Sequence, residues 1–105
     1  MLVLEDLGNQ YGYEALSPTS AKGITASIYN PTSGLYQGRM AKAVLIGVET
    51  NAIRFRMDGT AATATAGMLL PANNYYTIIN AENIKNFSCI DTAAGASSVK
   101  VLAFF

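Results

Sequence analysis

The clearest pattern in this chain is the alternation of apolar and polar residues in its middle part. In Ile53-Arg54-Phe55-Arg56 every second side chain is apolar, which is the period of a β-strand with one buried face. The earlier run Val44-Leu45-Ile46 is apolar at every position and predicts a central strand that is covered on both faces. We expect strands over 42–49 and 52–57, joined as a β-hairpin by the turn Thr50-Asn51.

Shorter runs predict the remaining strands, because most of them are bounded by Gly, Pro or Asn. They cover residues 24–29, 67–70, 75–79, 85–91 and 98–105. We expect the last two to pair as a hairpin across 92–97. Phe87 and Ile90 are three positions apart, so burying both side chains requires a β-bulge near Ser88-Cys89.

The regular recurrence of short strands sets the expected fold class, since no stretch shows a helical period. It predicts an all-β domain over residues 21–105, either a small antiparallel β-sandwich or a jelly-roll-like barrel. Residues 1–20 have no sustained period and are expected to form an extended N-terminal arm. The apolar side chains of this arm are candidates for contacts with another molecule: Leu2, Leu4, Leu7, Tyr11 and Tyr13.

The surface composition argues for assembly. Charged residues make up 13% of the chain, against about 25% in an ordinary soluble protein, so a lone monomer would be poorly solubilised. We therefore expect neighbouring subunits to cover part of the surface. Seven basic and seven acidic residues cancel and form no run of one sign, which argues against nucleic acid or an anionic membrane as a partner.

Two further features bear on location. The longest apolar run, 43–48, is far shorter than the roughly 20 residues of a membrane-spanning helix. Residues 1–4 run directly into Glu5-Asp6 and are too short for a secretion signal. The single Cys89 cannot form an intramolecular disulfide, in keeping with synthesis in a reducing cytoplasm.

Residues suited to catalysis or metal binding are few. The chain has no histidine, the usual general acid or base at neutral pH. Glu49 and Asp91 are expected to point outward, and Cys89 lacks a neighbouring base and is expected to be core filler. Asp58-Gly59 offers one carboxylate, too few for calcium; Gly59 is instead expected to take a positive φ and Asp58 to bond its own backbone. We expect no enzymatic activity, no cofactor and no metal site.

Several strand and turn motifs within residues 41–105 resemble those of a known family. They are Val48-Glu49-Thr50, Ile53-Arg54-Phe55-Arg56, Asp58-Gly59-Thr60, Thr63-Ala64-Thr65-Ala66-Gly67 and Val99-Lys100-Val101-Leu102-Ala103-Phe104. In these motifs the chain resembles small β-rich virion structural proteins of tailed bacteriophages, a capsid decoration or cement-like family. Members often carry proline where this chain has Ala62, a difference expected to loosen that loop. The resemblance does not extend to residues 1–40.

The resemblance implies a structural role in the phage head. The chain would be a decoration (cement) protein that bridges capsomers on the outside of the shell, with the major capsid protein and copies of itself as partners. A trimer is the expected oligomer and the virion the expected location, after synthesis in the host cytoplasm. Two alternatives stay open. One is a head-tail connector, tail or fibre-base component of the virion, and the other is a stand-alone glycan- or peptide-binding β-sandwich.

The predicted domain adds interface candidates of its own. Arginines on one strand face either clamp a partner or pair within the sheet. Tyrosines in segments without a burial signal often anchor contacts. Phe104 and Phe105 lie on opposite faces of the last strand, so one core cannot bury both. The candidates are Tyr36, Arg54, Arg56, Leu102 and Phe104.

Overall fold

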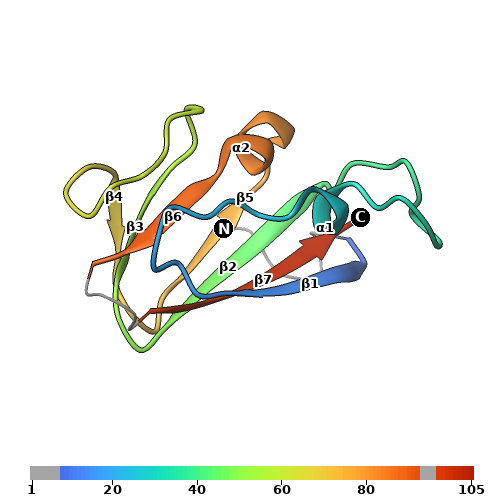
Figure 1. The fold of residues 1–105 in the computed structure, drawn as a ribbon. Helices are drawn as coiled ribbons and strands as arrows, with labels where there is room; N and C mark the ends of the chain where they lie inside the picture. Colours follow the sequence, from blue (N-terminus) through green and yellow to red (C-terminus); the bar gives the residue numbers. More distant parts are fainter. Residues whose placement is uncertain (1–7, 93–96) are drawn as a thin grey trace.

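The computed structural model describes residues 8–92 and 97–105, which form two antiparallel sheets packed against each other (Figure 1). The first sheet has the strand order β1-β7-β2-β5 and the second has the order β4-β3-β6. The strands are β1 (Gln10–Leu16), β2 (Ala43–Glu49), β3 (Ile53–Arg56), β4 (Met68–Leu70), β5 (Tyr75–Ile78), β6 (Ser88–Asp91) and β7 (Ser98–Phe104). The all-β, antiparallel, two-sheet architecture predicted from the sequence is confirmed.

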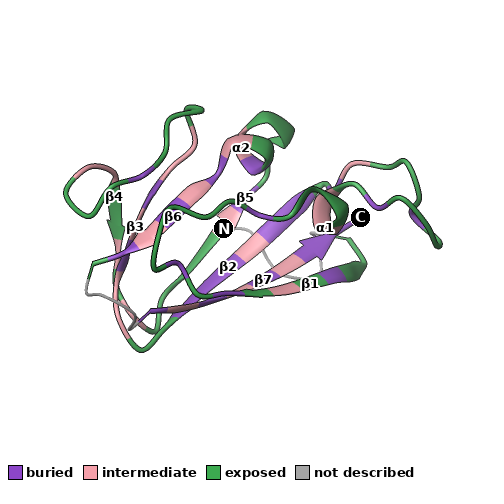
Figure 2. Ribbon diagram, viewed as in Figure 1, coloured by how far each residue is buried: buried purple, intermediate pink, exposed green. Residues whose placement is uncertain are grey.

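The core lies between the sheets, and its buried residues concentrate on β2 and β7 (Figure 2). The register of these strands places Val44 opposite Ala103 and Ile46 opposite Val101, so apolar side chains of both strands share one face. Each of these four side chains is fully buried. The second sheet adds Ile53, Phe55 and Cys89 from its inner face. As expected for a central strand, β2 has a neighbour on each side.

The strands predicted over 42–49 and 52–57 exist, but the hairpin between them is wrong. Both edges of β2 are occupied, by β5 and β7, so the chain crosses at residues 50–52 into the other sheet. There β3 pairs with β4 and β6. The hairpin predicted across 92–97 is wrong for a similar reason, because β6 and β7 belong to different sheets.

Two of the crossings between the sheets, β2 to β3 and β6 to β7, are tied together by one carbonyl group. The Ala52 oxygen accepts hydrogen bonds from the Thr92 backbone N–H (3.3 Å), the Thr92 hydroxyl (3.1 Å) and the Ser97 hydroxyl (3.0 Å). Thr50 adopts φ 74°, which bends the chain at the start of the first crossing. The crossings therefore have polar contacts that a hairpin would not need.

Two short helices replace parts of predicted strands. The strand expected over 24–29 is wrong, because residues 26–29 form the single helical turn α1 (Ala26–Tyr29). This turn packs beside β1, where the Glu14 carboxylate accepts hydrogen bonds from the N–H and hydroxyl of Thr25. Ile24 and Ile28 are four apart, a spacing that fits a helix as well as a strand.

The second helix, α2 (Ala81–Asn86), takes the start of the strand expected over 85–91. Asn80 caps it, with its Oδ1 accepting from the N–H groups of Glu82 (2.9 Å) and Asn83 (3.2 Å). Phe87 ends the helix and is buried beside Phe55, with ring centroids 5.8 Å apart. The β3–β6 register is regular, so the predicted bulge is absent.

The arm predicted over 1–20 is wrong for residues 10–16, which form β1 and pair with β7 from Gln10 opposite Phe104 to Leu16 opposite Val99. The segment after it also joins the domain. The Asp91 N–H donates to the Pro18 carbonyl (2.9 Å), and Lys22 and Cys89 exchange two backbone hydrogen bonds of 2.8 Å. Leu2, Leu4 and Leu7 lie outside the described residues.

Candidate functional site

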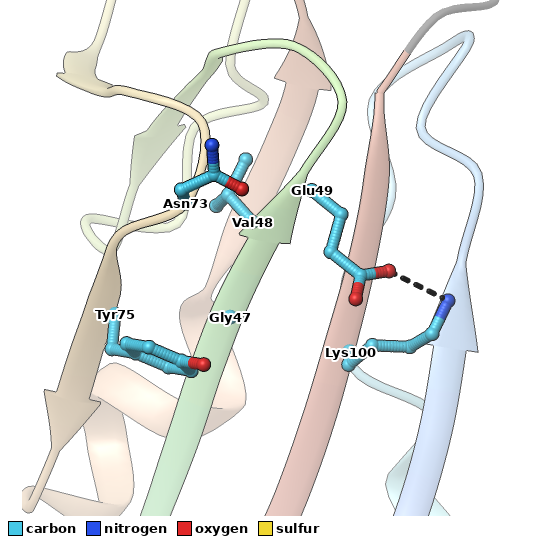
Figure 3. Close-up of a pocket in the computed structure, with 6 residues that line it drawn as sticks. All are labelled: Gly47, Val48, Glu49, Asn73, Tyr75 and Lys100. Atoms are coloured by element: carbon cyan, nitrogen blue, oxygen red, sulfur yellow. Dashed lines mark ion pairs between the residues drawn. The ribbon is translucent and has the colours of Figure 1, made fainter.

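The outward face of the four-stranded sheet carries a hollow. Across this face the register aligns Tyr75 of β5, Gly47 of β2 and Lys100 of β7 in one row. Because Gly47 has no side chain, nothing fills the middle of the row, and a cavity of about 310 Å³ opens there. Val48, Glu49 and Asn73 complete its lining (Figure 3).

Tyr75 forms one wall of the hollow. Its side chain is 73% exposed and reaches from β5 toward β2 (Figure 3). A Cβ atom at position 47 would lie 3.1 Å from Cε1 and 3.3 Å from Cδ1 of the ring, closer than ordinary contact. Glycine at position 47 therefore lets the phenol ring lie against the sheet, with one face toward solvent.

The other walls are polar. Glu49 Oε1 and Lys100 Nζ form an ion pair of 3.3 Å, and Nζ also donates to the Ser98 hydroxyl (2.9 Å). Asn73 adopts φ 64° and donates its N–H to the Val48 carbonyl (2.7 Å), which fixes the turn that carries its side chain. The ion pair is solvent-exposed, so we expect it to contribute no more than about 1 kcal/mol to folding.

A second candidate surface consists of the open sheet edges. β1 and β5 are the outer strands of the first sheet, and β4 is an outer strand of the second. The opposite edge of that sheet, β6, is partly covered by the bridge from Lys22 to Cys89. Large apolar side chains are exposed on or beside the three open strands: Tyr11, Tyr13, Met68, Leu69, Tyr75, Tyr76 and Ile79. Such edges are templates for pairing with another chain.

The arginine candidates use their donors within the chain. The Arg54 side chain donates to the carbonyls of Ala64 and Gly67, both at 3.1 Å, and so holds the loop that follows β3. Arg56 pairs with Asp58, which also accepts from the Thr60 N–H (3.1 Å). The predicted bond from Asp58 to its own backbone is confirmed, and the arginines are structural in this geometry.

The aromatic candidates separate into buried and exposed groups. Tyr36 is only 9% exposed and stacks on Phe105, with centroids 4.8 Å apart, while its hydroxyl accepts from the Asn9 amide (3.1 Å). Tyr13 is 54% exposed on β1. Phe105 belongs to the main core and Phe104 to a small cluster on the opposite face, as the strand period predicted.

The small cluster bears on two of the interface candidates, Phe104 and Leu102. Phe104 and Ala43 are buried in it, with Leu45 and Leu102 packed against them. Phe104 is therefore already buried within the subunit. A substitution there would affect the folding of the subunit first, and an interface only after that. Leu102 is half-buried and keeps part of its surface accessible.

The described residues hold few groups for chemistry. Cys89 is buried in the core, as predicted, and burial raises the pKa of its thiol to about 12, so it is a poor nucleophile. Asp91, expected to point outward, is instead 5% exposed on the inner face of β6. In the part of the chain that the structure describes, no three His, Cys, Asp or Glu side chains gather as a metal site would require.

The sequence alone does not reveal the hollow, because Gly47, Tyr75 and Lys100 are far apart in the chain. One signal pointed to it. A lone glycine inside an apolar strand, such as Gly47, often marks a close approach by another group.

The comparisons with known proteins add no relative. Searches against protein-family models, curated proteins and solved structures found no match to this chain. Among residues 8–92 and 97–105, neither helix has the length or apolar character needed to cross a bilayer.

Proposed function

We propose that this protein is a structural subunit of a tailed-bacteriophage virion, a capsid decoration (cement) protein that acts as a homo-oligomer. The observation that supports this most is the presence of exposed apolar side chains on two separate edges. Tyr13 projects from β1, and Met68 and Leu69 project from β4. The two strands lie on opposite sides of the molecule (Figure 1).

Two different apolar edges suit a ring-shaped oligomer. An oligomer with cyclic symmetry above a dimer needs two unlike surfaces, one on each side of the subunit, whereas a two-fold dimer needs only one. The β1 edge (Tyr11 and Tyr13) of one copy would contact the β4 edge (Met68 and Leu69) of the next. A trimer closes with three such contacts and leaves no β1 or β4 edge open.

Binding across capsomers would stabilise the shell by linkage. A subunit that binds only the assembled head lowers the free energy of that state by an amount set by its affinity and concentration. This role requires a binding surface and a rigid fold, and it requires no catalytic group. The sparse charge of the chain, 13% of its residues, also fits a surface that partners cover.

The proposal is tested by adding the purified protein to heads of the phage that carry none. We expect saturable binding in a ratio that follows the capsid lattice, and an increase in the temperature at which the heads release DNA. Binding only at one vertex would support the connector alternative. The absence of binding, together with a monomeric state at high concentration, would contradict the proposal.

A further inference from the structure

The hollow on the outward face of the first sheet has the features of a ligand site. Its floor is the Gly47 backbone and one wall is the exposed ring of Tyr75. A Cβ atom at position 47 would crowd that ring, so glycine leaves the space in which the ring lies against the sheet. The ring is largely exposed and presents a flat apolar surface to solvent.

The polar groups around the ring are neutral in sum. Glu49 and Lys100 carry opposite charges 3.3 Å apart, so an anion would meet the carboxylate and a cation would meet the ammonium group. The ion pair is formed through Oε1 of Glu49, and Asn73 brings a side-chain amide to the lining of the hollow. The hollow therefore offers both donors and acceptors to a neutral ligand.

A pyranose ring matches these groups. One face of the sugar carries C–H bonds, which pack on an aromatic face, and its edge carries hydroxyls that both donate and accept. The geometry points to a carbohydrate subsite in which Tyr75 stacks on the sugar ring while Asn73, Glu49 and Lys100 bind its hydroxyls. The cavity of about 310 Å³ lies at the lower end of the range for small-molecule sites, which suits one sugar unit of a longer glycan.

This subsite does not depend on the proposed role in the virion. The residues that line it differ from those assigned to the contact between copies, which are Tyr11, Tyr13, Met68 and Leu69. A particle that displays many copies would bind a glycan surface by avidity even if each site is weak. The two proposals can therefore fail separately.

The test uses the full chain and a panel of neutral sugars: glucose, galactose, mannose, N-acetylglucosamine and N-acetylgalactosamine, each added to millimolar concentration. Chemical-shift changes in ¹H–¹⁵N NMR spectra report the site. We expect at least one sugar to shift the amides of Gly47, Asn73 and Tyr75. No shift with any sugar, or shifts confined to other residues, would overturn the inference.

Matched variants separate stacking from hydrogen bonding. Tyr75→Phe keeps the ring and should bind nearly as well, whereas Tyr75→Ala should weaken binding on the order of tenfold. Asn73→Gly keeps the positive φ of the turn but removes the amide, and should also weaken binding. Tyr13→Ala, at the opposite edge, should leave it unchanged. Equal binding by wild type, Tyr75→Ala and Asn73→Gly would contradict the subsite, and thermal unfolding confirms that each variant is folded.

Discussion

The Arg56 guanidinium and the Asp58 carboxylate form a two-bond pair just after β3, with Nη2–Oδ2 at 2.5 Å and Nε–Oδ1 at 3.2 Å. The hydrogen bonds from Arg56, and next the bond from the Thr60 N–H, lower the pKa of Asp58 below its ordinary value of 3.8. A lowered pKa means that the folded state favours the ionised carboxylate more than the unfolded state does. The pair therefore links folding to pH.

The sign of this linkage gives the first prediction. Stability from Asp58 is present at neutral pH and is lost as the pH falls below about 3.8 and through the lowered pKa. Asp58→Asn should thus be less stable than the wild type at pH 7, with the difference shrinking by pH 2. Thermal unfolding across this range measures it. A difference that does not change with pH would contradict the linkage.

The next prediction concerns Gly59, whose φ of 86° confirms the left-handed conformation expected from the sequence. No heavy atom lies within 4 Å of a Cβ built there, so a substitution meets no steric contact and its cost comes from the backbone alone. Gly59→Val should lower the free energy of unfolding by about 1–3 kcal/mol. Gly59→Asn should lower it less, because asparagine tolerates this conformation. Equal melting temperatures for wild type and Gly59→Val would show that the loop relaxes freely.

The sequence predicted the strands better than their partners. A period of two identifies β2 and β3 as strands, but it carries no information on which edges are already occupied. Both edges of β2 are occupied by strands that come later in the chain, and this forces the crossing at residues 50–52. Long-range pairing therefore decided the topology, and local pattern could not reveal it.

The helix α2 was predictable in principle. Asn80 followed by Glu82 in the first turn and Lys85 in the last is a capping and charge pattern typical of a helix. The strand predicted over 85–91 begins too early, because residues 85 and 86 belong to the helix and β6 begins at Ser88. The hollow was less accessible to prediction, since Gly47, Tyr75 and Lys100 meet only through the register of three strands.

The buried Cys89 gives a third prediction. Its thiol pKa is raised from 9.0 to about 12 by burial, so the folded state resists its ionisation. Stability from the neutral thiol is complete below pH 9 and is lost as the pH rises toward 12. At pH 8 iodoacetamide should therefore label Cys89 in the unfolded protein far faster than in the folded protein. Similar rates in both states would show that the thiol is accessible. Cys89→Ala, which cannot be labelled, gives the background signal.

The last prediction tests how the proposed copies join. If the β1 edge of one copy contacts the β4 edge of the next, then Tyr13→Lys and Met68→Lys should each prevent oligomer formation, because each buries an unpaired charge in every contact. Leu35→Lys, at an exposed apolar position outside both edges, should not prevent it.

An equal mixture of Tyr13→Lys and Met68→Lys retains one unaltered β1 edge and one unaltered β4 edge between unlike subunits. The mixture should therefore form dimers that cannot close into a ring. Sedimentation velocity measures the wild type, the three variants and the mixture, and circular dichroism checks that each variant is folded. A two-fold contact through β1 alone would give a different result: Tyr13→Lys would be monomeric, Met68→Lys would remain dimeric, and the mixture would contain no new species. A wild type that stays monomeric at high concentration would contradict both arrangements.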